Sequence, residues 1–192
     1  MSVLDVLLSG GIYNVIALVD KSCQKEDFVY GKPVVEESSA KNLNVRNAIV
    51  AIGDNTVRKK VFEKLRNDGY LIINAVSHLA YVSPRAELGC GVVVMPFSVV
   101  NIGVRIGDGT IINTRASVDH DTVVGDFCHI APGSALCGFV NVGNESFICA
   151  GSTVIDRITI GEKAIVGAGA MVNRNVLARQ TVIGVPAKPI LK

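Results

Sequence analysis

The fold is decided by residues 112–138, which read INTRASVDHDTVVGDFCHIAPGSALCG. Every sixth residue of this stretch is aliphatic: Ile112, Val118, Val124, Ile130 and Leu136. The period continues outward without a slip or an insertion, back to Val82 and on to Val172, so that sixteen positions in a row match. A fixed period of six is typical of hexapeptide-repeat parallel β-helices, in which each coil covers the aliphatic side chains of the one before.

The repeat has other regular positions. The residue four places after each aliphatic is small or β-branched, as in Ala116 and Ser134, and the residue directly after the aliphatic is often glycine, as in Gly107 and Gly125. Glycine there suits a corner that needs a positive φ or a close approach of two backbones. Three units make one triangular coil of 18 residues, so residues 81–170 supply five coils. A helix or an alternating strand would show a period of 3.6 or 2 instead.

The chain divides near residue 76, where the period of six begins. Before this point the sequence predicts a helix over residues 54–68, with a cap at Asp54 or Asn55, a stop at Gly69 and an apolar side. That apolar side consists of Val57, Val61, Phe62 and Leu65. Short buried strands are expected at residues 13–19 and 46–52, another strand at residues 71–75, and a polar loop at residues 21–44 apart from a possible strand end near residues 33–35.

Strands that alternate with a helix predict a small α/β domain over residues 1–76, with a partial Rossmann-like parallel sheet. The β-helix then occupies residues 77–192. Ligands of such sheets lie beyond the carboxyl ends of the strands, here near Asp20 and the Gly53-Asp54-Asn55 turn. The free amides of that helix start would accept a phosphate or a sugar hydroxyl, and the alternative is a plain helix cap.

Composition excludes several classes of protein. Nineteen basic and seventeen acidic residues give a net charge of +2 without a basic stripe, so nucleic acid is not an expected partner. No stretch approaches the roughly 20 apolar residues that span a bilayer, and the N-terminus does not resemble a signal peptide. Five cysteines form no C-x-x-C pair, and we expect them to be buried free thiols in a cytoplasmic protein. They are Cys23, Cys90, Cys128, Cys137 and Cys149.

Two of the three histidines interrupt the repeat. His120 is flanked by Asp119 and Asp121, and a carboxylate beside an imidazole fixes its tautomer and raises its basicity, as a general base requires. His129 lies nine residues further on, half a coil away, so the two rings point from different sides of the prism. They could share a site only across a contact between two copies of the chain. His78, at the domain junction, is expected to be a surface or hinge residue.

From about Gly53 to its end the chain resembles the hexapeptide-repeat sugar acetyltransferases of the sialic-acid O-acetyltransferase type. That family includes the N-acetyltransferases of nucleotide-linked 4-amino sugars in bacillosamine and perosamine synthesis. The resemblance rests on residues 112–138, on Ile-Gly-Asp-Asn at residues 52–55 with Arg58, and on IGVPAK at residues 183–188. It implies a left-handed β-helix, a homotrimer with sites between subunits, acetyl-CoA as co-substrate, a nucleotide-sugar acceptor and no metal.

The resemblance also implies roles for individual residues. His120 would be the general base and Asp121 would orient it, while Asn113 would lie beside the acceptor. His129 and the N–H of Gly138 would bind the acetyl carbonyl and stabilise the oxyanion. The other expected contacts are Ala150 and Ala168 with the pantetheine arm, Lys188 with the CoA phosphates, and Asp20, Gly53, Asp54 and Asn55 with the nucleotide sugar. Transfer would be direct, without an acyl-enzyme.

The resemblance departs from the family pattern at the N-terminus. Residues 1–8 correspond to the helix that follows a strand and a glycine-rich loop, so we expect either a start placed too far downstream or a loss of that half of the nucleotide site.

Three alternatives stay open from the sequence. The acceptor could be sialic acid or another sugar hydroxyl, and the chain could be a non-catalytic scaffold or regulatory subunit. A γ-type carbonic anhydrase would bind zinc through three histidines across subunits, but the prism of this chain offers only two, with His78 just before its first coil.

Overall fold

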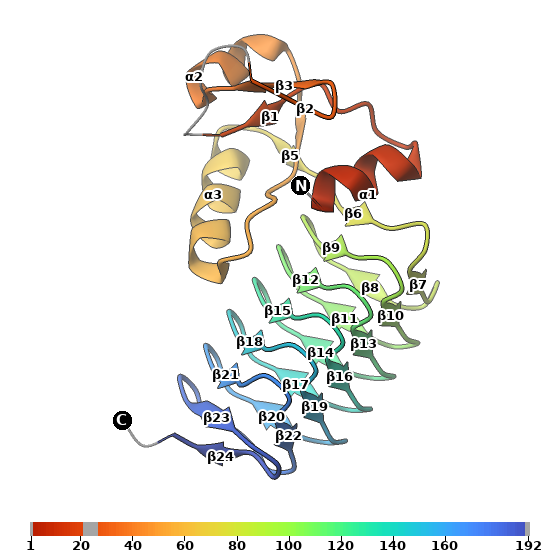
Figure 1. The fold of residues 1–192 in the computed structure, drawn as a ribbon, viewed down its shortest axis with the longest axis vertical. Coiled ribbons are helices and arrows are strands. Elements are labelled where there is room, and N and C mark those ends of the chain that lie inside the picture. Colours follow the sequence, from red (N-terminus) through yellow and green to blue (C-terminus); the bar gives the residue numbers. More distant parts are fainter. Residues whose placement is uncertain (1, 21–26, 191–192) are drawn as a thin grey trace.

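The structure is a computed structural model that describes residues 2–20 and 27–190. Figure 1 shows an α/β domain above a prism of stacked coils, with helix α3 (Asn55–Asn67) running beside the first coils. The prism is a left-handed parallel β-helix, as the repeat and the resemblance predict. In the part of the chain that is described, no helix has the length and apolar character needed to cross a membrane.

Three parallel sheets form the sides of the prism. The β7 face contains β7 (Tyr81–Val82), β10 (Val99–Val100), β13 (Ser117–Val118), β16 (Ala135–Leu136), β19 (Thr153–Val154) and β22 (Met171–Val172). The β8 face contains β8 (Glu87–Leu88), β11 (Arg105–Ile106), β14 (Val123–Val124), β17 (Asn141–Val142) and β20 (Thr159–Ile160). The β6 face contains β6 (Ala75–Val76), β9 (Val93–Val94), β12 (Ile111–Ile112), β15 (His129–Ile130), β18 (Phe147–Ile148), β21 (Ile165–Val166), β23 (Thr181–Ile183) and the antiparallel β24 (Lys188–Pro189).

The register confirms the 18-residue coil. Val100 pairs with Val82 in the coil before and with Val118 in the coil after. The repeated aliphatics form a single core, in which Ile112 and Ile148 are fully buried. Buried hydroxyls at the small positions are bonded to backbone carbonyls, and among the described residues no buried side-chain nitrogen or oxygen lacks a hydrogen bond. Burial of polar groups therefore costs this core little.

Close backbone approach, not positive φ, explains the glycine that follows the aliphatic on the β8 face. Gly107 is not in the left-handed region, but a Cβ there would stand 2.4 Å from Oδ1 of Asp126 in the next coil. That oxygen accepts the N–H of Asp108 at 2.8 Å, so the two coils are joined at the corner by a side-chain hydrogen bond. Any other residue at 107 would push this bond apart.

The α/β domain packs on the β6 face through α1 (Ser2–Gly10), the helix expected over residues 1–8. Val6 and Leu7 of α1 share a buried cluster with Val93 and Ile111 of the prism. These contacts cover the outer side of the first strands of the β6 face.

Two short parallel pairs confirm the α/β reading of the N-terminal part. β1 (Leu18–Val19) pairs with β3 (Lys32–Val35), and β4 (Asn47–Ala48) pairs with β5 (Leu71–Ile72). The prediction of buried strands over residues 13–19 and 46–52 was wrong in extent and burial, because only two residues of each are paired and Val19 is 54% exposed. The strand expected at residues 71–75 is split between β5 and β6.

The expected polar loop contains more structure than the sequence predicts. β2 (Phe28–Val29) forms an antiparallel hairpin with β3, and α2 (Glu37–Ala40) and the 3-10 turn η1 (Lys41–Leu43) follow. These elements are too short to produce a hydrophobic period, so sequence pattern missed them.

The bounds and caps predicted for helix α3 are confirmed. Asp54 accepts the N–H of Val57 at 2.8 Å, and Gly69 ends the turn with φ +87°. The predicted apolar side was wrong in one member, because Val57 is 47% exposed.

The expectation of buried free thiols holds only in part. Cys90, Cys128, Cys137 and Cys149 are free, and Cys23 lies outside the described residues. Only Cys128 is fully buried, and burial raises its pKa to about 12. Cys90 is exposed because its turn is at the outer corner of the prism.

Candidate active site

The corner that joins β13 to β14 carries a histidine–carboxylate pair. Nδ1 of His120 lies 3.0 Å from Oδ2 of Asp121. Because an ionised carboxylate only accepts hydrogen bonds, Nδ1 is the donor, and in the neutral form of the ring Nε2 carries the lone pair. Asp121 holds the left-handed position of the turn, with φ 56°, which Asp tolerates better than most residues. The two side chains are 44% and 52% exposed, so the pair is open to an incoming molecule.

The ring of His120 is held against the next coil. A Cβ at Gly138 would stand 2.7 Å from both Cε1 and Nε2 of the ring, so only glycine leaves room for it. Phe139 meets the ring edge-on, with centroids 5.2 Å apart, and Arg157 stacks over Phe139 at 4.6 Å from its centroid. These contacts fix the direction in which Nε2 points.

The backbone N–H of Gly138 has no hydrogen-bond partner among the described residues. One coil earlier, Oδ1 of Asp119 binds the corresponding N–H, that of His120, at 2.8 Å. Cys137 precedes Gly138 and offers no such oxygen. A free donor beside an imidazole is the arrangement that stabilises a developing oxyanion.

Ala150 and Ala168 lie at the corner between the β6 and β7 faces, in successive coils. Both are exposed, and neither N–H has a partner among the residues that the structure describes. The equivalent position one coil before Ala150 is Pro132, which has no N–H, and the position before that is Thr114, whose N–H binds Asn113. The two alanines thus offer a small surface and two unused donors in line.

His129 lies on β15, on a different face from His120, as the half-coil spacing predicts. Its Nε2 is 3.0 Å from Nδ2 of Asn113. Oδ1 of Asn113 accepts the N–H of Thr114 at 2.8 Å, which fixes the amide so that its nitrogen faces the histidine. Nε2 of His129 is therefore an acceptor.

The Gly53-Asp54-Asn55 turn lies over this part of the β6 face, held by Arg58 from the first turns of α3. Arg58 is fully buried, and its guanidinium donates to the carbonyls of Ile52 at 3.0 Å and Gly53 at 2.8 Å. The same side chain reaches three prism carbonyls: those of Gly109 at 2.6 Å, Phe127 at 3.0 Å and Cys128 at 3.0 Å.

Burial lowers the pKa of both His129 and Arg58 in this cluster. Burial, and then the positive charge of Arg58, lower the pKa of His129 to about 4, against a backbone hydrogen bond with Gly53 that favours the protonated ring. The His129 ring is therefore neutral at physiological pH. Burial also lowers the pKa of Arg58 to about 10, which still leaves it charged.

The side-chain amide of Asn55 already makes its hydrogen bonds within the protein. Its Nδ2 donates to the carbonyls of Glu145 at 3.1 Å and Ser146 at 3.2 Å, and its Oδ1 accepts from Arg58 at 2.8 Å. The side chain of Asp54 caps α3. Asn55 thus joins the helix to the prism, and the exposed backbone of Gly53 and Asp54 is what remains for a ligand.

The predicted site residues fall into separate groups. His120, Asp121 and Gly138 meet at one corner; Asn113, His129 and the 53–55 turn meet on the β6 face; Ala150 and Ala168 follow along the neighbouring corner. Asp20 is exposed at the end of β1, and Lys188 is exposed on β24. Within one chain the first group lies at the far end of the β7 face from Asn113.

The role of Arg58 was missed from the sequence, although a pattern could have indicated it. Arg58, Val61, Phe62 and Leu65 follow the spacing of one helical stripe, and the last three pack in the interface cluster. The buried side of α3 therefore includes Arg58 and does not include Val57. An arginine within an apolar stripe is a sign of a buried clamp onto carbonyl groups.

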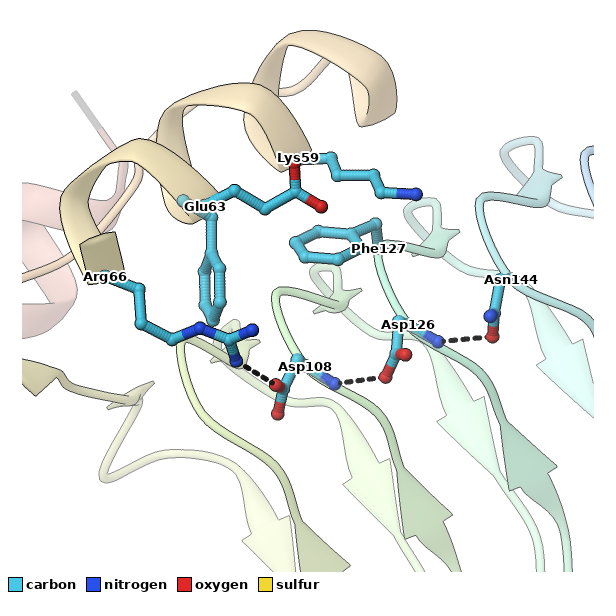
Figure 2. Close-up of a pocket in the computed structure, with 8 residues that line it drawn as sticks. Lys59, Glu63, Arg66, Asp108, Asp126, Phe127 and Asn144 are labelled. Atoms are coloured by element: carbon cyan, nitrogen blue, oxygen red, sulfur yellow. Dashed lines mark hydrogen bonds and ion pairs between the residues drawn. The ribbon is translucent and has the colours of Figure 1, made fainter.

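A cavity of about 240 Å³ lies between α3 and the corner where the β8 and β6 faces meet. Figure 2 shows Asp108, Asp126 and Asn144 on successive coils, with the N–H of Asp108 bound to Oδ1 of Asp126 and the N–H of Asp126 bound to Oδ1 of Asn144. Oδ1 of Asp108 accepts the N–H of Cys90 in the same way. Arg66 reaches Oδ2 of Asp108 at 3.5 Å, and Lys59 extends over the ring of Phe127. No histidine lines the cavity, so it is not the site of the His120 pair.

Among residues 2–20 and 27–190, no group of three His, Cys, Asp or Glu side chains could hold a metal ion within one chain.

The β-helix, the histidine–carboxylate corner and the docked α/β domain define a hexapeptide acyltransferase. Residues 1–65 match the family described as the PglD N-terminal domain. A histidine mutant of perosamine N-acetyltransferase from Caulobacter crescentus, solved with CoA and GDP-perosamine, is 40% identical with a TM-score of 0.95, and the match covers 100% of this chain and 91% of that one. The chain belongs to the PglD-like hexapeptide sugar N-acetyltransferases, the family of the perosamine and bacillosamine N-acetyltransferases.

Two further relatives agree with this assignment. The acetyltransferase domain of PglB from Neisseria gonorrhoeae FA1090, solved with acetyl coenzyme A, is 34% identical with a TM-score of 0.92, over 98% of this chain and 93% of that one. GDP-perosamine N-acetyltransferase of Escherichia coli O157:H7 is 30% identical over 91 residues, which are 47% of this chain and 41% of that protein. The chain thus matches less than half the length of this curated relative. The resemblance found in the sequence is confirmed.

Proposed function

We propose that this protein transfers the acetyl group of acetyl-CoA to the amine of a nucleotide-linked 4-amino sugar. The observation that carries the proposal is the His120–Asp121 pair beside the free N–H of Gly138, on a fold whose relatives were solved with CoA, acetyl-CoA and GDP-perosamine. This arrangement supplies a base and an oxyanion donor at one corner.

The chemistry follows from the hydrogen bonds of His120. Asp121 holds the proton on Nδ1, so Nε2 takes a proton from the sugar amine as its nitrogen attacks the thioester carbon. The carbonyl oxygen becomes an oxyanion, which the N–H of Gly138 stabilises. The C–S bond then breaks, and CoA leaves as its thiol after receiving that proton. The N–C bond formed and the C–S bond broken balance without an acyl-enzyme or a redox step.

Acetyl-CoA would lie along the corner that carries Ala150 and Ala168. Their small side chains leave room for the pantetheine arm, and their unused N–H groups match its amide carbonyls. Lys188, exposed on β24 near the last coil, would meet the CoA phosphates. The acetyl end would then reach the neighbourhood of His129.

The nucleotide sugar would bind near Asp20 and the exposed backbone of Gly53 and Asp54, with Asn113 beside the reacting sugar. The start of α3 favours a negatively charged group such as a diphosphate. Asn55 would act there by holding the turn in place, since both hydrogens of its amide face prism carbonyls.

A homotrimer would bring the separate groups together. The outward residues of the β7 face are all uncharged, whereas the β8 face carries Glu87 and Arg105. Uncharged residues are favoured at the core of an interface. Packing the β7 face and its corner with His120 against a neighbouring subunit would place His120 opposite that subunit's Asn113 and His129. We propose a cytoplasmic location for this assembly, where free cysteines such as Cys90 stay reduced.

The test is mass spectrometry of reactions that contain acetyl-CoA and UDP-, dTDP- or GDP-linked 4-amino sugars, or free sialic acid, with wild-type protein and His120→Ala. Mass detection avoids thiol reagents, which the cysteines would confuse. We expect a gain of one acetyl group on an amino sugar, strongly reduced in His120→Ala. Product from sialic acid alone would make the protein an O-acetyltransferase, and no product from any acceptor would overturn the proposal.

A further inference from the structure

Arg58 links the turn of the α/β domain to the histidine of the prism. Its Nη1 holds the Gly53 carbonyl at 2.8 Å, and its Nη2 holds the Cys128 carbonyl at 3.0 Å. The Cys128 carbonyl belongs to the peptide bond that leads into His129, while Gly53 faces the His129 ring. One buried side chain therefore holds both the backbone that leads into His129 and the Gly53 backbone that the His129 ring faces.

The geometry also decides how the ring is protonated. Thr114 fixes the amide of Asn113, and that amide points a hydrogen at Nε2 of His129 across 3.0 Å. With Nε2 accepting, the ring proton must be on Nδ1, on the side of Gly53. His129 then has no hydrogen to offer on the Asn113 side, and the second hydrogen of the Asn113 amide is the donor that remains.

We propose that Arg58 is a positioning residue of the acetyl site: it locks the Gly53 turn against His129, keeps that ring in its Nδ1–H form, and so makes Asn113 the side chain that donates to the acetyl carbonyl or the sugar. The proposal rests on the acetyltransferase function proposed above. It revises the role that the family resemblance implies for His129, which becomes a fixed acceptor. The positive charge of Arg58 also disfavours protonation of the ring, in agreement with this role.

The proposed positioning role requires the planar, forked arrangement of N–H groups in the guanidinium of Arg58. The guanidinium donates to six oxygens, with one N–H of Nη2 shared between two of them: the carbonyls of Ile52 and Gly53, three prism carbonyls, and Oδ1 of Asn55. Lysine has the charge but not the planar fork, so it could not hold the turn and the strand together. Lys59 supplies a matched control, because it joins the same helix to Glu145 of the prism without reaching His129.

The test uses long-range ¹H–¹⁵N NMR of the histidine rings in the full-length protein. In the wild type we expect His129 to show the Nδ1–H tautomer and to stay neutral down to about pH 5. In Arg58→Lys and Arg58→Met we expect mixed tautomers, and a kcat lowered about tenfold or more with a smaller change in KM for the nucleotide sugar. Lys59→Met should retain the wild-type tautomer and kcat.

Either of two results would overturn the proposal. The first is a wild-type His129 that carries its proton on Nε2, which needs no variant and no substrate. The second is a folded Arg58 variant with unchanged His129 resonances. If the proposed acetyl transfer fails while the wild-type tautomer and its change in the Arg58 variants are as expected, the proposed reaction is wrong, and Arg58 still positions the His129 ring. If Arg58 variants do not fold, the wild-type spectrum still decides.

Discussion

The ring of His120 rests on the backbone of Gly138, so closely that a Cβ at residue 138 would stand 2.7 Å from Nε2. The glycine is required by this contact and not by its φ, which is outside the left-handed region. Gly138→Ala should turn the exposed ring away while the core stays intact. We expect kcat/KM to fall about tenfold or more, with a Tm change of only a few degrees.

The matched control for this variant is Gly10→Ala, where an added Cβ meets nothing within 4 Å and φ is not positive. Steady-state kinetics and thermal unfolding of both proteins give the comparison. Full activity of Gly138→Ala would show that the ring has room and that its direction is not fixed by this contact.

Asp121 can be tested without disturbing its turn. Asn tolerates the left-handed φ of 56° nearly as well as Asp, so Asp121→Asn removes the charge beside Nδ1 and keeps the backbone. We expect kcat to fall about ten- to hundredfold with little change in stability. Asp121→Ala should lose similar activity and also some stability, because alanine is strained there. Equal kcat for wild type and Asp121→Asn would remove the carboxylate from the mechanism.

A single N–H of the proposed acetyl-CoA site can be deleted cleanly. Ala150 occupies the corner position that Pro132 holds one coil earlier, so Ala150→Pro fits the turn and removes only the donor. We expect KM for acetyl-CoA to rise about three- to tenfold, since a hydrogen bond is worth about 1 kcal/mol. Tm should be unchanged or slightly higher.

The control for Ala150→Pro is KM for the nucleotide sugar, which should not move. Titration calorimetry with CoA measures the same loss without turnover. Unchanged CoA affinity in a folded variant would place the pantetheine arm elsewhere.

His129 should make the protein less stable in mild acid. Its pKa falls from 6.5 to about 4 on folding, so the unfolded chain takes up this proton more readily than the folded one. Stability is therefore unaffected above pH 6.5 and is lost as pH falls from there toward 4, by an amount on the order of 2–3 kcal/mol.

Urea unfolding across this range, with wild type and His129→Gln, checks the sign. The variant cannot titrate and should show a flatter curve between the two values. His78→Gln is the matched control substitution at an exposed histidine. A wild-type curve without this slope would contradict a neutral, half-buried His129.

Glu145 holds two lysines at the domain interface. Its side chain is 7% exposed and lies 2.8 Å from Lys59 and 3.4 Å from Lys163. The hydrogen bond from Lys59 is the main cause that lowers the pKa of Glu145 below its usual 4.5. Its contribution is therefore present above that value and is lost as pH falls below it.

Glu145→Gln should lower the free energy of unfolding at neutral pH by about 1–2 kcal/mol, since both lysines are about a third exposed and solvent screens the pairs. The difference from wild type should shrink in acid. Glu162→Gln, at an exposed carboxylate that also meets Lys163, should cost much less. Equal losses of unfolding free energy in the two variants would show that the burial of Glu145 does not strengthen its ion pairs.

The prism was predictable from the sequence because its physical cause is local and repeated. One aliphatic side chain must be buried every six residues, and sixteen copies of that requirement leave no other register. The cap and stop of α3 were predictable for the same reason, since Asp54 and Gly69 act within one turn of the chain. His120 with Asp121 are neighbours in sequence, so their contact needed no fold.

Only the tertiary structure decided what meets across long separations. The bonds from Arg58 to Phe127 and Cys128, and from Asn55 to Ser146, join groups 69 to 91 residues apart. The two-residue strands of the α/β domain are fixed by their partners and by the face on which they pack, because they are too short to carry a period of their own. The protonation of His129 belongs to this second class: the sequence supplies an imidazole, and the buried arginine and fixed amide around it determine which nitrogen holds the proton.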